Sequence, residues 1–150
     1  MTPYVARFVS IYEQESLEII GKILKAMPDV DYGVDAGGEQ LFVSCHVLAR
    51  VVTSFFPKFP YRDGYYADFF EHSWNVTPTG HVLDVYPVGC LGGPIIIDGD
   101  IIAGPGKALY SARDISELRH ASSKGQYFLP MLEKASRAFA KTMQDLGYQV

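Results

Sequence analysis

The chain has 150 residues, 48% of them hydrophobic, and a net charge of -4 from 13 basic and 17 acidic residues. This length suffices for one well-filled core and is too short for two ordinary domains, so we expect a single domain over 1–150. The acidic balance, without long blocks of like charge, excludes an electrostatic footprint for nucleic acid or an anionic membrane surface. Small or neutral partners fit the composition better.

The sequence also bears on where the protein works. No window approaches the roughly 18 apolar residues that a membrane span needs. The segment Met1–Arg7 lacks the basic stretch and the continuous apolar run of a secretion signal. We therefore expect a cytoplasmic protein, and in that reducing compartment Cys45 and Cys90 should both be free thiols.

The first part of the chain is predicted to be helical. Apolar residues at helical spacing indicate a helix over 3–27, either continuous or broken near Glu15–Ser16. Residues 28–40 are rich in aspartate and glycine and should form a loop. A second helix over 44–56 is apolar on more than one face, which places it inside the domain. Residues 58–64 then read as a connection.

Strands follow in the middle of the chain. Two alternating runs, 66–76 and 81–88, are joined by the turn residues 77–80 and predict a hairpin. The isoleucine-rich runs 95–97 and 101–103 flank a further turn and predict a second strand pair.

Helical signals return at the end. Residues 114–117 have the spacing of a capping box, and apolar residues recur at helical spacing over 127–146. The order of helices, then strands, then helices indicates an α+β fold with an antiparallel sheet.

Cys45 is the first candidate for chemistry. Ser44 before it is a preferred helix cap, so Cys45 falls in the first turn of the predicted helix. Unpaired N–H groups and the helix dipole favour the reactive thiolate there. The alternative for an isolated cysteine is a small buried hydrophobic residue.

His72 and Asp84 lie on the two runs of the predicted hairpin. In the register that we expect, His72 lies directly opposite Asp84 and Trp74 directly opposite Val82, on one face. The carboxylate would then orient the imidazole as a base for the thiol. Taken singly, the histidine could be satisfied by a backbone carbonyl, and the aspartate could sit at a strand edge or turn.

A cysteine at the start of a helix, followed by a histidine on one strand and an aspartate on the next, resembles the core of the transglutaminase-like superfamily of papain-type cysteine enzymes. The resemblance covers about a third of the chain, residues 40–88. It implies a central buried helix packed on an antiparallel sheet, to which the N- and C-terminal helices expected from their spacing are additions. The matching segments are Ser44-Cys45-His46-Val47-Leu48-Ala49-Arg50, Gly64-Tyr65-Tyr66, His72-Ser73-Trp74 and Gly80-His81-Val82-Leu83-Asp84-Val85-Tyr86-Pro87.

The resemblance also implies roles for individual residues. Cys45 would be the nucleophile, His72 the general base and then acid, and Asp84 the residue that orients the imidazole. Trp74 would pack beneath the site. Gln40 is a candidate oxyanion donor, with an exposed loop glutamine as the alternative. Tyr65 and Tyr66 would line the cleft.

Other features of the sequence indicate no cofactor. His46 and His81 with Asp84 or Glu71 lack the spacing of a metal site, so we expect no metal. Residues 104–107 lack the full phosphate-loop spacing and should form a turn. Residues 89–93 are expected to form a wall of the cleft, with Cys90 an inert thiol.

The function predicted from the sequence is acyl transfer through a thioester at Cys45. The substrate would be a peptide, a protein side-chain amide or a small amide, and hydrolysis, deamidation and amine transfer all remain open. The alternative is a non-catalytic binding module of the same fold that uses an aromatic-rich surface formed by Tyr61, Tyr65, Tyr66, Phe69 and Phe70. A subunit whose cleft is completed by a partner is a third alternative.

Overall fold

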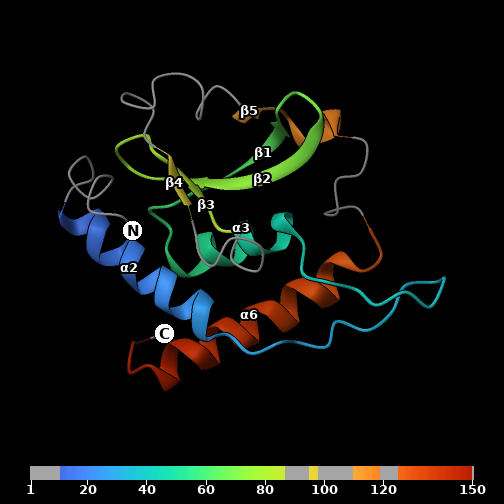
Figure 1. Cartoon of the computed structure of the whole chain (residues 1–150), viewed down its shortest axis with the longest axis horizontal. Coiled ribbons are helices and arrows are strands. Elements are labelled where there is room, and N and C mark those ends of the chain that lie inside the picture. The colour runs from blue at the N-terminus through green and yellow to red at the C-terminus, as the bar shows by residue number, and fades with distance from the viewer. Residues whose placement is uncertain (1–10, 87–94, 98–109, 119–124, 150) are drawn as a thin grey trace.

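A computed structural model describes residues 11–86, 95–97, 110–118 and 125–149. It has the α+β architecture that the sequence predicted, with the helices gathered on one side of a sheet (Figure 1). No helix in these ranges has the length and hydropathy of a membrane span. The elements in chain order are α2 (Ile11–Ala26), α3 (Cys45–Phe55), β1 (Tyr61–Tyr66), β2 (Phe70–Val76), β3 (Val82–Asp84), β4 (Ile95–Ile97), β5 (Tyr110–Ala112), the short 3-10 helix η1 (Ile115–Glu117) and α6 (Phe128–Asp145).

Within the described residues the sheet has five strands in the order β4-β3-β2-β1-β5, and every neighbouring pair is antiparallel. β2 is therefore the central strand. Strand β5 joins the outer side of β1, where Gly64 pairs with Ala112. A Cβ at Gly64 would lie 2.0 Å from the backbone oxygen of Ser111, so only glycine allows β5 to approach this closely.

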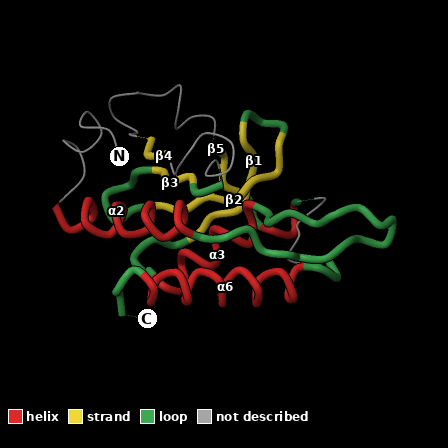
Figure 2. Tube along the Cα trace, turned by 60° about the horizontal axis from the view of Figure 1, so that its bottom comes forward, coloured by secondary structure: helices red, strands yellow, loops and turns green. Residues whose placement is uncertain are grey.

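Helix α3 lies between the sheet and α6, as both views show (Figures 1 and 2). Most of its first eight residues are buried, which confirms the predicted internal helix. On its far side, Phe55 stacks on Phe139 of α6 with ring centroids 5.0 Å apart. The apolar residues on more than one face of α3 are explained by this position between two layers.

Asn75 of β2 joins α3 to the sheet. Its side chain is fully buried, and its Nδ2 group donates to the backbone oxygens of Ala49 and Phe59, each at 3.0 Å, and to Thr53 Oγ1 at 3.1 Å. Thr53 Oγ1 donates to the same two carbonyls at 3.2 and 2.8 Å, so the amide and the hydroxyl form one cluster. This contact fixes the middle of α3 against the central strand.

We expect Asn75→Ala to lower the free energy of unfolding by about 1–3 kcal/mol, because it removes a fully buried amide together with its three hydrogen bonds. Chemical denaturation would measure the loss. Ser54→Ala on the exposed face of α3 serves as a milder comparison, since the hydroxyl that it removes donates to a single carbonyl of the same helix, that of Val51. Equal stability of Asn75→Ala and the unmodified chain would contradict this role.

The helix predictions agree with the structure where it describes them. The predicted helix 3–27 is observed as α2, which is continuous through residues 15–16; residues 1–10 lie outside the described part. The helices expected over 44–56 and 127–146 are α3 and α6. The predicted capping box opens a single 3-10 turn, in which Asp114 accepts from the Ser116 N–H at 2.9 Å.

The strand predictions need three corrections. The run 81–88 is a strand only over Val82–Asp84, and residues 87 and 88 lie outside the described part. Residues 58–64 are not only a connection, because β1 begins at Tyr61. The run 66–76 is not one strand, because a tight turn separates β1 from β2. That turn places Ala67 and Asp68 at positive φ, 54° and 58°, without the glycine or asparagine that normally announces such a turn. The predicted strand 101–103 lies outside the described residues.

Candidate active site

Cys45 opens helix α3. The Ser44 side chain accepts from the Val47 N–H at 3.2 Å, and the Ser44 carbonyl accepts from the Leu48 N–H at 3.1 Å, so the helix start is fixed by its cap. The N–H groups of Cys45 and His46 have no hydrogen-bond partner among the described residues. Cys45 is a free thiol that is only 7% exposed. Cys90, the other cysteine, lies outside the described part of the chain.

His72 and Asp84 meet as the sequence predicted. His72 Nε2 lies 2.8 Å from Asp84 Oδ2, and the two side chains are 12% and 6% exposed. The Tyr110 hydroxyl donates to the same oxygen at 2.7 Å, and the Tyr86 N–H reaches Oδ1 at 3.3 Å. Because Asp84 occupies Nε2, the ring nitrogen left for the thiol is Nδ1.

The register that brings them together differs from the predicted one. Asn75 pairs with Leu83, and Val76 with Val82, so this register places Asp84 opposite Trp74 and not opposite His72, and Val82 is not the partner of Trp74. The loop between β2 and β3 sets this register. The Thr77 N–H donates to the His81 carbonyl at 2.9 Å, so the loop consists of residues 78–80. Its last residue, Gly80, has a positive φ of 87°. A shift of two preserves the face of every side chain. His72 and Asp84 are therefore diagonal neighbours, not direct partners.

Aromatic rings surround the imidazole. Trp74, 3% exposed, stacks on His72 with centroids 6.3 Å apart, as expected for a residue beneath the site. Tyr66 and Tyr110 lie at 6.2 and 6.1 Å from the same ring. Tyr65, predicted beside Tyr66 as a cleft residue, instead directs its hydroxyl to the Glu117 carbonyl at 3.5 Å, because consecutive strand residues face opposite sides.

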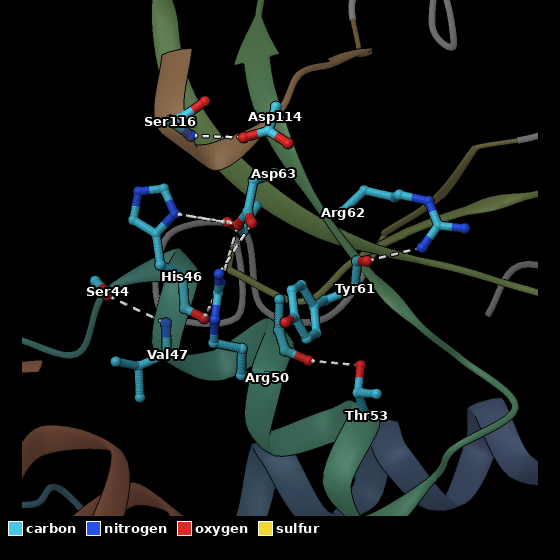
Figure 3. Close-up of polar contacts among 12 residues, drawn as sticks. Ser44, His46, Val47, Arg50, Thr53, Tyr61, Arg62, Asp63, Asp114 and Ser116 are labelled. Carbon is cyan, nitrogen blue, oxygen red and sulfur yellow. Dashed lines mark hydrogen bonds and ion pairs between the residues drawn. The ribbon is translucent and has the colours of Figure 1, made fainter. Parts of the chain in front are cut away.

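A second imidazole, which sequence reasoning missed as part of the site, adjoins Cys45. His46 Nδ1 lies 2.5 Å from Ser73 Oγ, and the Ser73 hydroxyl donates to Asp63 Oδ1 at 2.6 Å. Arg50 holds Asp63 through two bonds of 3.0 and 2.9 Å. Figure 3 shows His46 and Arg50 converging on Asp63 from α3. The available signal was a histidine directly after the candidate nucleophile.

The two imidazoles change the acidity of Cys45. Burial alone would raise the pKa of the thiol, but hydrogen bonds and positive charge from His46 and His72 outweigh burial and lower this pKa to about 6. A thiol of pKa about 6 is largely ionised at neutral pH. The thiol is therefore in its nucleophilic form under ordinary conditions.

The histidines shift in the opposite direction. Burial disfavours the charged His72, but hydrogen bonds to Asp84 and Cys45 raise its pKa to about 9. In the same way, Asp63 and Cys45 outweigh burial and raise the pKa of His46 to about 9. Burial opposes ionisation of Asp63 as well, yet hydrogen bonds from His46, Arg50 and Ser73 hold the pKa of its carboxyl well below the usual range. The neutral-pH site is thus a thiolate beside two imidazolium ions.

Gln40 does not join this group of residues. It is exposed and forms a single antiparallel bridge with Val34 in the long loop between α2 and α3. That loop extends away from the helices and the sheet (Figure 2). This is the placement of the exposed loop glutamine that the sequence left as the alternative.

Neither a protein-family model, nor a curated protein, nor a solved structure matches this chain. Within the described ranges, no group of three or more His, Cys, Asp or Glu side chains could hold a metal ion. The geometry of Cys45 and its neighbours is therefore the basis for assigning a function.

Proposed function

We propose that the protein is a thiol enzyme of the transglutaminase-like, papain-type class. It would transfer the acyl group of an amide, isopeptide or peptide bond to water or an amine. The observation that carries this proposal is the His72–Asp84 pair at 2.8 Å, whose imidazole interacts with the thiol at the start of a buried helix.

The proposed reaction uses the two protonation states of His72. The Cys45 thiolate attacks the carbonyl carbon, and His72 Nδ1 gives its proton to the leaving nitrogen as the C–N bond breaks. Water or an amine then gives a proton to His72 and attacks the thioester, and the C–S bond breaks to restore the thiolate. Asp84 keeps the ring oriented throughout through its bond to Nε2.

Backbone groups are the best-placed donors to the developing oxyanion. The N–H groups of Cys45 and His46 are unpartnered among the described residues, and they lie in the first turn, where the helix dipole adds positive potential. Gln40, exposed in its loop, need not contribute.

Burst kinetics with p-nitrophenyl acetate test the proposal without knowledge of the natural substrate. We expect rapid release of nitrophenol, equal in amount to the enzyme, followed by slower turnover. Mass spectrometry after acid quenching should find the acetyl group on the peptide that contains Cys45. Peptide amides can then be screened with water and with methylamine as acceptors.

Two cysteine variants make the test specific. Cys45→Ser should lose both the burst and the acetylated peptide, whereas Cys90→Ser should retain both. A burst that survives in Cys45→Ser, or an unmodified Cys45 in the native chain, would contradict the proposal.

One observation favours the alternative function of a binding module. Phe69 and Phe70, at the turn between β1 and β2, are 79% and 60% exposed, and their rings contact each other at 5.2 Å. Exposed paired aromatics are typical of recognition surfaces. If no acyl-enzyme forms, a peptide-binding role of this turn becomes the leading function.

A further inference from the structure

The charges around Cys45 divide into two sets. His72 is paired with Asp84, and Arg50 is paired with Asp63, so each of these pairs is neutral by itself. Neither pair has a net positive charge left for a buried thiolate. The remaining ionisable side chain that interacts with Cys45 is His46.

We propose that His46 is a second imidazole of the site, a stationary cation that stabilises the Cys45 thiolate while His72 alone moves the proton. This inference rests on the proposed function and extends it. His46 would act as a positioning and charge-balancing residue, not as the acid or base.

The hydrogen bonds of His46 support a stationary role. The Ser73 hydroxyl commits its hydrogen to Asp63 at 2.6 Å, so Ser73 Oγ must accept from His46 Nδ1–H at 2.5 Å. Nε2 is thereby the ring nitrogen that this network leaves uncommitted. Ser73 has no exposed surface and His46 is 8% exposed, so the ring is held in one orientation away from bulk water.

Arg50 fixes the outer end of this chain. Besides its two bonds to Asp63, it donates to the His46 carbonyl at 3.1 Å, and its guanidinium lies 4.2 Å from the centre of the Tyr61 ring. Asp63 also lies 3.9 Å from His46 Nδ1. The charged or titratable groups facing His46 are thus Cys45 and Arg50 from α3 and Asp63 from β1, with Ser73 from β2 between them.

Every proton transfer of the proposed catalytic cycle can be assigned to His72 while His46 stays protonated. The C–S bond forms while His46 keeps both of its ring protons, and the proton that the leaving nitrogen takes comes from His72. When the thioester is resolved, a proton from water goes to His72, the C–S bond breaks, and the sulfur leaves as the thiolate that the His46 charge stabilises. Loss of His46 would leave the thiolate without a net counter-charge.

The pH dependence of the rate at which Cys45 is alkylated tests the proposal. Rates with iodoacetamide across pH should show a midpoint at about 6 in the native protein. We expect His46→Gln to move this midpoint upward by at least about one pH unit, a tenfold loss of thiolate at acidic pH. Ser73→Ala should move it in the same direction by less. His81→Gln, a buried histidine on the β2–β3 loop, is the matched control and should leave it unchanged.

A second measurement needs no variant. Ring nitrogen NMR of the native protein should find His46 protonated through neutral pH, with its titration at about 9. Titration of His46 near the ordinary histidine value of about 6.5 would overturn the proposal even if His46→Gln fails to fold.

Failure of this inference is distinguishable from failure of the proposed function. An unchanged alkylation midpoint in a folded His46→Gln that still forms the acetyl thioester overturns the role of His46 alone. Absence of the thioester in the native chain overturns the acyl-transfer function, whatever the midpoint.

Discussion

Replacing His72 with glutamine is expected to slow hydrolysis of the acetyl thioester at Cys45 by about 100-fold or more. The attacking water would lose its general base, and positioned proton transfer contributes about 10²–10⁴ to such rates. The burst and the slow phase of p-nitrophenyl acetate turnover separate the two steps. The burst should be less affected, because nitrophenol leaves without a proton.

The same residue predicts the pH dependence with an amide substrate. The attacking thiolate forms as pH rises through about 6, and the protonated His72 needed by the leaving amine is lost as pH rises through about 9. A plot of kcat/KM against pH should therefore be bell-shaped with these two limbs. With the activated ester, the alkaline limb should disappear.

His81→Gln provides the control for removing an imidazole from this sheet. It should preserve both the hydrolysis rate and the bell-shaped profile. Hydrolysis at the native rate by a folded His72→Gln chain would remove His72 from the proposed mechanism and make His46, the other imidazole that interacts with Cys45 in the described part of the chain, the candidate base.

The sequence located Cys45 correctly because the signals that place it are local. Ser44 caps the helix, and the apolar pattern that follows it predicts burial, so both facts can be read within a dozen residues. The common face of His72 and Asp84 was also predictable, since side-chain direction in a strand repeats every two residues. Their exact pairing was not, because it depends on which three residues form the loop, 77–79 or 78–80.

The network around His46 was missed for a non-local reason. Asp63 was assigned to a connection, although it lies in the middle of β1 opposite Ser73. Only the β1–β2 pairing brings Asp63, Ser73 and His46 together. Likewise, Tyr110 reaches Asp84 through β5, a three-residue strand too short to show a pattern. Partners supplied by short strands distant in sequence cannot be recognised from periodicity.

The second large effect concerns stability. Asp63→Ala is expected to lower the free energy of unfolding by about 3–5 kcal/mol, because it leaves the Arg50 guanidinium largely buried without its carboxylate. The two side chains are 12% and 9% exposed. The variant also removes the acceptor of the Ser73 hydroxyl, so the orientation of His46 should be lost with it.

An exposed ion pair in the same chain supplies the comparison. Lys141 and Asp145 lie 2.8 Å apart on α6, but their side chains are 75% and 63% exposed. Asp145→Ala should therefore cost no more than about 0.5 kcal/mol. Urea denaturation of both variants would compare them directly, and equal losses would contradict the buried character of the Arg50–Asp63 pair.

The sign of the pH effect follows from the depressed pKa of Asp63. A carboxyl whose folded-state pKa lies below its unfolded value contributes stability that is fully present above the unfolded pKa, about 4, and is lost as pH falls further. Lowering the pH should thus destabilise the native chain more than it destabilises the Asp63→Ala variant. The difference in free energy of unfolding between the two proteins should shrink as the pH falls below 4. The double variant Arg50→Leu/Asp63→Leu, which removes both charges, should be more stable than Asp63→Ala at neutral pH, because no charge is left buried alone.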